Sequence, residues 1–598
     1  MGTDIALQKK IQKAIAFKLD GENKKAVAVL EGLLVDRPYH LTILSSLAEL
    51  YTVEFKYALA VEMYKKMLMV LDEDDDCDQV GIISINIATN LHTLALYSEA
   101  EQYFNLAQKL LPDNLNVLER KANFLVDIGR VDDAKILYET VLNVDRRNIG
   151  AICGIANILV SKREFLSAVA EFKRALSIAP NQPNILFGLV NTYMKAKEYD
   201  LAVQVGLKAL AANPQFVALL LSLSSIYLHQ KQLSLALDYC NKALEINPST
   251  LLSWNMKAHI LSQMHRFDEA DECYEQAALL ATPPDDVIYK KSLQQLLLGK
   301  FDIGWEKHEA RLNLYALKRL APLQVQNATR WHHSCALKPD ETLLVYSEQG
   351  LGDTLQFVRF IPWLVEQGIN VILYVQPALR SILRTVPILN DCIVDEIEGE
   401  INYFVPLMSL PYEFKMTVES IPTALKFGLP EEKSQKWRKR LSESSTSKKI
   451  GLVSTGNIQH LNDYNRSISL EALLPYLPPQ HQYFILQKDI RPEDQAILDS
   501  TQTKINIEFL GNELEDFIDT ACACENLDLL ITVDTSVAHL AGSLDIPCWV
   551  MLSFTPDWRW LLQSDDTHWY PNMRLFRQSE YGEWFEVFAK VHRLLVNL

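Results

Sequence analysis

Residues 156–180 read ANILVSKREFLSAVAEFKRALSIAP, and the spacing of small, bulky and proline residues in this stretch recurs through the first half of the chain. Ala156 and Ala168 lie twelve residues apart, Phe172 follows Ala168 by four residues, and Pro180 closes the unit. Small residues let two helices cross closely, while the bulky residue fills the gap to the next pair. Proline cannot continue a helix, so it predicts the end of the second helix.

The alanine at the second of these positions recurs every 34 residues, apart from one step of 40. It stands at Ala26, Ala60, Ala100, Ala134, Ala168, Ala202, Ala236 and Ala270. The extra residues of the long step coincide with the acidic run LDEDDDCDQV, residues 71–80, which lacks the glycine and terminal glutamate of a calcium loop. We therefore predict a solvated insertion there, and a solenoid of stacked helix pairs over residues 1–315.

This spacing resembles that of tetratricopeptide repeats over roughly residues 7–282, with a degenerate ninth unit at LLLGKFDIGWEKHEARL, residues 296–312. The resemblance implies a concave surface that binds an extended peptide or a partner protein. We expect a protein partner for this part of the chain.

Charge and composition narrow the function classes. The 598 residues carry 58 Lys and Arg against 75 Asp and Glu, a net charge of −17, which disfavours general attraction to nucleic acid or anionic lipid. The chain starts without the apolar core of a signal peptide, and no stretch reaches 18 apolar residues. Nine scattered cysteines fit a reducing compartment. We expect a cytoplasmic protein with no membrane span and no metal site.

From residue 341 onward the 34-residue period is lost, and short apolar runs alternate with helical stretches. This alternation predicts parallel sheets, with strands at TLLVYS, NVILYV, KIGLVST, YFILQ, INIEFL, LDLLITV and PCWVML. The polar segment 428–449 interrupts the series. We predict a linker over 316–340 and two Rossmann-like lobes, 341–430 and 431–598. Ligands in such sheets bind at the carboxyl ends of the strands.

Polar residues follow several of the predicted strands. Asp534, Thr535 and Ser536 begin a helix, where free N–H groups favour a phosphate, although Asp534 or Ser536 serving as a simple N-cap is the alternative. Arg466 is a candidate diphosphate clamp, or else a surface partner of Asp463. Lys488 stands at a third strand end.

Five stretches together resemble the C-terminal domains of heptosyltransferases and, more distantly, of protein O-GlcNAc transferase. They are SEQGLGDTLQFVRFIPWL (347–364), STGNIQHLNDYNRSI (454–468), LQKD (486–489), VDTSVAHLAG (533–542) and PDWRWLLQSDDTHWYPNMRLFRQ (556–578). The resemblance covers nearly all of residues 341–598. It implies a GT-B fold, in which the second lobe binds a nucleotide-sugar and the first supplies the acceptor side and a base. It also implies that the last helix returns to brace the first lobe.

The turn YSEQGLGD, residues 346–353, would hold the base. Gly350 and Gly352 suit a chain that leaves a strand and brings its backbone close to a ligand. The resemblance makes Asp353 the catalytic base for a one-step displacement with inversion. The alternative is that Asp353 caps the helix that follows.

The donor side is expected to gather residues from several loops of the second lobe. Its remaining candidates are Asn457, Gln487, His539, Asp557 and Arg559. His539 completes a D-T-x-x-x-H pattern, although a lone helical histidine is more often structural. The pair Asp565–Asp566 has the wrong spacing for a metal-binding D-x-D, so we expect a metal-independent enzyme without a cofactor.

These features predict a glycosyltransferase that moves a sugar from a nucleotide-sugar to a side-chain hydroxyl of a protein held by the repeats. Related repeat-bearing enzymes suggest flagellin or another surface protein as the acceptor. One alternative is a glycan or lipid-linked acceptor, as in heptosyltransferases. The other is a non-catalytic repeat scaffold.

Overall fold

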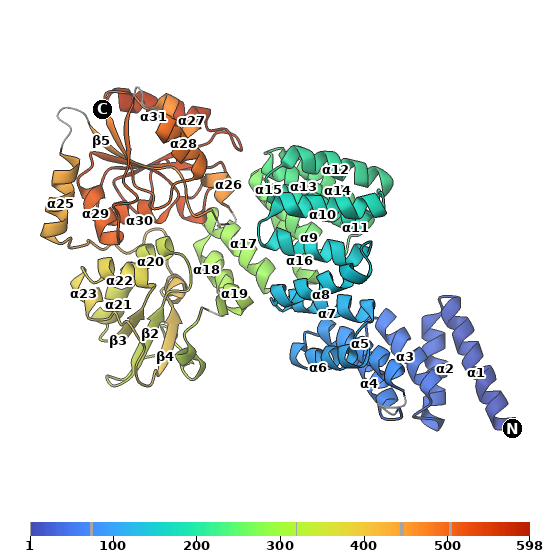
Figure 1. Ribbon diagram of the computed structural model, residues 1–598. Coiled ribbons are helices and arrows are strands. Elements are labelled where there is room, and N and C mark those ends of the chain that lie inside the picture. The colour runs from blue at the N-terminus through green and yellow to red at the C-terminus, as the bar shows by residue number, and fades with distance from the viewer. Residues whose placement is uncertain are drawn as a thin grey trace. The chain divides into compact units, whose positions relative to one another are not determined.

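The computed structural model describes residues 2–71, 76–318, 320–442, 448–458, 460, 462–500 and 505–598 (Figure 1). The chain divides into two compact units, Met1–Ile226 and Tyr227–Leu598. Residues 72–75 of the acidic run lie outside the described residues, so the predicted insertion stays a prediction there.

Consecutive helix pairs build the first half of the chain, as the repeat period predicts. All eight alanines of the 34-residue series are fully buried where two helices cross. The helices are α1 (Gly2–Leu19), α2 (Asn23–Asp36), α3 (Leu41–Val53), α4 (Tyr57–Leu68), α5 (Cys77–Thr93), α6 (Tyr97–Leu110), α7 (Leu115–Asp127), α8 (Val131–Val144), α9 (Ile149–Ser161), α10 (Phe165–Ile178), α11 (Pro183–Lys195), α12 (Tyr199–Ala212), α13 (Val217–His229), α14 (Leu233–Ile246), α15 (Leu251–Gln263) and α16 (Phe267–Leu280). The predicted solenoid is confirmed.

The turns inside the helix pairs share a backbone conformation that the sequence analysis did not identify. A residue with positive φ follows the first helix of each of the nine pairs: Gly21, Phe55, Ala95, Gly129, Arg163, Lys197, Lys231, His265 and Gly299. A left-handed residue closes a helix within a tight turn, and side chains other than glycine enter it at some cost. The same period therefore sets both the crossings and the turns.

A ninth helix pair, α17 (Asp285–Leu297) and α18 (Phe301–His308), packs into the α/β region. Phe301 and Trp305 belong to the hydrophobic core that also contains the strands of the first sheet. The ring centroids of Trp305 and Trp558 lie 5.1 Å apart, edge to face. The second compact unit thus begins within the repeats, at Tyr227, well before the predicted linker.

The α/β region contains two separate parallel sheets (Figure 1). The first has the order β1-β4-β2-β3 and the second β10-β9-β8-β5-β6-β7. The strands are β1 (Thr329–Arg330), β2 (Thr342–Tyr346), β3 (Asn370–Tyr374), β4 (Tyr403–Pro406), β5 (Lys449–Val453), β6 (Gln482–Ile485), β7 (Asn506–Phe509), β8 (Leu529–Val533), β9 (Cys548–Leu552) and β10 (Met573–Arg577). All seven predicted strands are confirmed. β1, β4 and β10 were not predicted, because they are very short, end in proline or carry arginines.

The predicted linker over 316–340 is wrong in its second half. Thr329 and Arg330 pair with β4, and the Trp331 side chain is buried. Segment 329–331 therefore extends the first sheet, because the edge of β4 offers unpaired backbone groups that another segment can satisfy.

The predicted return of the last helix to the first lobe is also wrong. α31 (Phe585–Val596) places Val587, Phe588, Val591 and Leu595 in the core of the second sheet. His481 Nε2 lies 2.8 Å from the Leu595 carbonyl oxygen and holds the end of the helix there. The apolar stripe of α31 is covered by its own sheet, so no apolar face remains to brace the first lobe.

Candidate functional site

The second sheet reverses its winding between β5 and β8. From β5 the chain continues to β6 and β7 on one side, and β8, β9 and β10 lie on the other. In parallel sheets ligands bind beyond the carboxyl ends of the strands at such a reversal. Arg466 spans this point, since its Nη1 donates a hydrogen bond of 2.9 Å to the backbone carbonyl of Asp534 directly after β8.

Arg466 is not the surface partner of Asp463. That carboxylate pairs with Arg491 at 2.6 Å and accepts a hydrogen bond from Ser467. The Arg466 guanidinium instead lies against Gly456, where an added Cβ would come within 2.7 Å of Nη2. Its Nε is buried and has no hydrogen-bond partner among the described residues. Arg466 thus carries a positive charge at the reversal point and forms no ion pair with a carboxylate of the residues that the structure describes, which suits an anionic ligand.

The helix after β8, α30 (Ser536–Ser543), begins without a side-chain cap. Its N-cap residue is Thr535, not Asp534 or Ser536, and the Thr535 side chain forms no capping bond. The Thr535 hydroxyl lies 3.1 Å from that of Thr532 instead. The capping alternative is therefore wrong, and the first N–H groups of α30 depend on solvent or a ligand.

Asp534 lies half-buried beside this helix start. Burial raises the pKa of Asp534 to about 6; the charge of Asp557 adds to the rise, and Arg466 opposes it. A carboxyl with this pKa gives up part of its charge just below neutral pH, which reduces its repulsion of a neighbouring anion.

Asp353 belongs to the first lobe, in the first turn of α20 (Leu351–Phe357). Its Oδ2 accepts a hydrogen bond of 2.7 Å from the Gly350 N–H, so the predicted capping role is present. Its Oδ1 also forms an ion pair with Arg559. A single carboxylate thus caps α20 and contacts a residue that follows β9.

Arg559 joins the two lobes from the short helix η6 (Trp558–Trp560). Besides Asp353 it bonds Gln356 Oε1 through Nε at 2.5 Å and Asp557 Oδ1 through Nη1 at 2.7 Å. Burial lowers the pKa of Arg559, but Asp557 and Asp353 outweigh burial and raise it overall. The guanidinium is therefore a permanent positive charge between the lobes.

Gly352 lies where two helices approach closely. An added Cβ would lie 3.0 Å from His539 Cδ2, so Gly352 lets α20 and α30 pack together. Gly350 has an ordinary φ of −70°. The predicted contact of this turn with the donor stays a prediction.

The His539 side chain is enclosed in the packing around α30, and its predicted role in donor binding stays a prediction. This side chain is buried, Nδ1 lies 3.1 Å from the Tyr570 hydroxyl, and its ring stacks on Trp560. Burial, together with Arg559 and Arg359, lowers the pKa of His539 well below its usual value. A neutral, enclosed imidazole of this kind stabilises the packing of α30.

Three other predicted donor residues lie at strand ends of the same lobe. Gln487 Oε1 accepts hydrogen bonds from the backbone N–H groups of Ser454 (3.0 Å) and Thr455 (3.3 Å), so it ties β6 to β5. Lys488 Nζ donates to the carbonyls of Gly511 and Leu514, on the β7 side and away from the reversal point. Asn457 is exposed in the loop after β5. Neither Gln487 nor Lys488 contacts Arg466.

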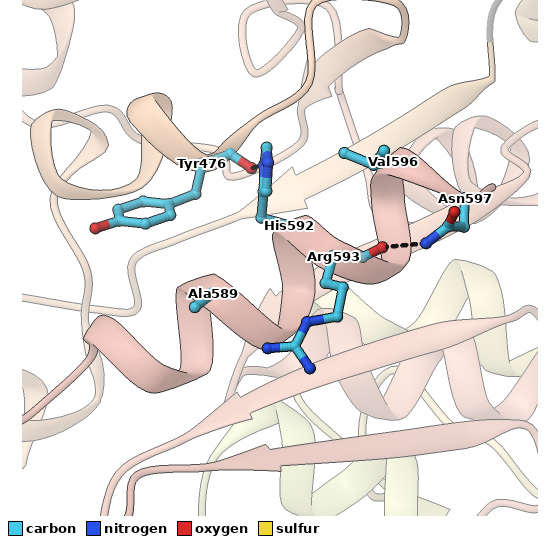
Figure 2. A pocket seen from close by; sticks show the side chains of 6 residues that line it. All are labelled: Tyr476, Ala589, His592, Arg593, Val596 and Asn597. Atoms are coloured by element: carbon cyan, nitrogen blue, oxygen red, sulfur yellow. Dashed lines mark hydrogen bonds between the residues drawn. The ribbon is translucent and has the colours of Figure 1, made fainter.

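Two cavities are lined by residues other than Arg466, Asp353 and Arg559. One of about 380 Å³, shown in Figure 2, adjoins the end of α31, where the Asn597 amide bonds the Arg593 carbonyl; it contains none of the predicted residues. The other, of about 300 Å³, lies at the carboxyl ends of β2 and β4 and is lined in part by Tyr346 and Glu348. The second cavity stands at the reversal point of the first sheet.

The described residues contain no group of three or more His, Cys, Asp or Glu placed to hold a metal ion. Within the same ranges, no helix is long and apolar enough to span a bilayer.

Models of the tetratricopeptide repeat match residues 153–215, 207–249 and 251–282. The chain carries tetratricopeptide repeats. Protein FlbA of Caulobacter vibrioides is 25% identical over 324 residues, which is 50% of this chain and 52% of FlbA. The chain thus spans about half the length of this curated relative.

Solved structures of repeat proteins are also similar to the chain. A tetratricopeptide repeat protein from Parabacteroides merdae is 16% identical and covers 42% of this chain and 98% of its own, with a TM-score of 0.38. A thermophilic repeat protein from Thermus thermophilus is 22% identical and covers 30% of this chain and 99% of its own, with a TM-score of 0.29. The matched family models concern the repeats and identify no enzyme family.

Proposed function

We propose that the chain is a metal-independent glycosyltransferase of the GT-B type, which transfers a sugar from a nucleotide-sugar to a side-chain hydroxyl of a protein. The repeats hold the acceptor protein, a surface protein such as flagellin being one candidate. The second lobe binds the donor, and Asp353 in the first lobe takes the proton of the acceptor hydroxyl.

The observation that carries the proposal is the group of charges at the strand ends. Arg466 and the uncapped start of α30 meet where the second sheet reverses. Asp353 reaches the same group through Arg559. A diphosphate needs fixed cations and N–H donors, and a hydroxyl nucleophile needs a base. The cluster offers both, one from each lobe.

Arg559 has a specific role in this mechanism. In the ligand-free arrangement it bridges Asp353 and Asp557. A bound diphosphate competes for its guanidinium, and this competition releases Asp353 to accept a proton. Donor binding would thereby prepare the base.

The test is a melting-temperature screen of the full chain with UDP-, GDP-, ADP- and CMP-linked sugars, followed by an assay for release of the nucleotide. A donor present at 100 times its Kd stabilises the fold by about 2.7 kcal/mol. We expect one nucleotide class to raise the melting temperature. No shift with any of them would favour the repeat-scaffold alternative.

Arg466→Ala is expected to weaken donor binding by about tenfold or more, because a lost charge-assisted hydrogen bond costs roughly 1.5–3 kcal/mol. Calorimetric titration with the donor found in the screen measures the change. Arg440→Ala is the control, since Arg440 pairs with Glu508 and Glu513 beside β7 and should leave donor affinity unchanged. Equal affinity in the Arg466→Ala protein would exclude this residue from the donor site.

A further inference from the structure

The last helix pair of the repeats, α17 and α18, packs beside the charged cluster formed by Asp353, Arg559 and Asp557. α17 packs against η6, which carries Arg559. From α18, the Trp305 ring contacts both Trp558 of η6 and Phe357 of α20. The repeats therefore contribute side chains directly around the Asp353–Arg559 pair.

Several polar atoms of α18 and of the neighbouring α20 are buried without a hydrogen-bond partner among the described residues. They are His308 Nδ1, Trp305 Nε1 and Gln356 Nε2, from side chains that are at most 2% exposed. Buried polar atoms that stay unpaired lower the stability of the fold. Native proteins seldom leave them so unless a water, ion or ligand completes the site.

The residues that carry these atoms are linked to one another through ring contacts and through Arg559. The His308 ring lies 5.6 Å from that of Trp305, and Gln356 bonds Arg559 through its other amide atom. The Tyr289 ring of α17 lies 5.3 Å from the His308 ring. Burial raises the pKa of Tyr289. The charges of Asp353 and Asp557 also raise it, and those of Arg311 and Arg559 oppose the rise. The Tyr289 hydroxyl therefore stays protonated.

All of these groups are uncharged at neutral pH. Burial, together with the positive charges of Arg311 and Arg559, lowers the pKa of His308 well below its usual value, so the imidazole is neutral. A phenol, an imidazole, an indole and an amide suit neutral hydroxyl groups, whereas Arg466 and the start of α30 suit an anion. Aromatic rings with a few placed polar groups are typical of small-molecule sites.

We propose that Tyr289 and His308 of the array, together with Gln356, form the subsite for the hydroxyl groups of the transferred sugar. This inference rests on the proposed function and adds that repeat residues select the donor. The atoms are covered in the present conformation, so the sugar reaches them when the Asp353–Arg559 contact opens.

The experiment compares nucleotides with and without a sugar by calorimetric titration of the full chain: UDP with UDP-N-acetylglucosamine, GDP with GDP-mannose, and ADP with ADP-glucose. Tyr289→Phe removes one hydroxyl from a half-buried ring and preserves its packing. We expect this variant to lose about three- to tenfold of the preference for the sugar-bearing nucleotide, with unchanged affinity for the nucleoside diphosphate. His308→Phe should show the same loss.

Tyr239→Phe is the matched control, because Tyr239 is a half-buried array tyrosine that stacks on Tyr227 of α13, outside the cluster. It should keep the wild-type preference. An unchanged preference in both Tyr289→Phe and His308→Phe, or equal binding of both nucleotide forms by the wild type, would overturn the subsite. Binding of none of the six nucleotides, together with no melting shift from the CMP-linked sugars, would overturn the proposed function itself.

Discussion

Replacing Asp353 by asparagine is expected to lower the turnover of sugar transfer by roughly 10²–10⁴-fold, the usual contribution of a general base. The substitution retains an oxygen that can accept the Gly350 N–H bond, so α20 keeps its cap. Arg559 keeps Gln356 and Asp557 as partners. Turnover is measured with the donor identified by the melting screen, and donor affinity and melting temperature are measured in parallel.

The capping role alone predicts another outcome. Asp353→Ala would then cost about 0.5–2 kcal/mol of stability while Asp353→Asn kept normal activity. Asp516→Asn is the control, because Asp516 also caps a helix, α29 (Phe517–Glu525), and also pairs with a cation, Lys433. It should leave turnover unchanged. Near-normal turnover by Asp353→Asn would remove Asp353 from the mechanism.

Trp305→Ala is expected to lower the free energy of unfolding of the second compact unit by about 3–5 kcal/mol. The side chain is 2% exposed and its ring contacts those of Phe301, Phe357 and Trp558. Alanine leaves a cavity where the repeats meet both lobes of the α/β region, and denaturant unfolding of the full chain measures the loss.

Trp254→Ala in α15 is the comparison for the Trp305 prediction. Trp254 is half-buried among the repeats and bonds the Pro248 carbonyl, so its loss should cost only about 1 kcal/mol. Equal effects of the two substitutions would mean that Trp305 does not join the repeats to the α/β core. Deletion of residues 1–315 removes Trp305, whereas deletion of residues 1–226 keeps it.

Much of the fold was predictable because its signals are local. The 34-residue series of small residues marks helix crossings that depend only on neighbouring helices. The seven predicted strands are apolar runs whose character follows from burial in a parallel sheet. The strands that escaped prediction, β1 and β4 among them, acquire their conformation from the neighbours they pair with.

The candidate site was predictable only in part. Polar residues after strands pointed to Arg466, Asp534 and Asp353, because the ends of parallel strands meet at one edge. Sequence patterns did not reveal that Lys488 bonds two carbonyls or that His539 is enclosed. Tyr289 and His308 were missed because nothing in a repeat unit marks the residue that will face another domain.

The sequence by itself determined the solenoid, the positions of seven strands along the chain and the polar character of the strand ends, since periodicity and local composition encode each of these. Only the tertiary structure decided which groups meet: Gly352 with His539, Asp353 with Arg559, and the last repeat with η6. The physical reason is that such contacts depend on how closely two packed elements approach. The spacing of residues along one segment of the chain does not determine the distance between two elements that pack together.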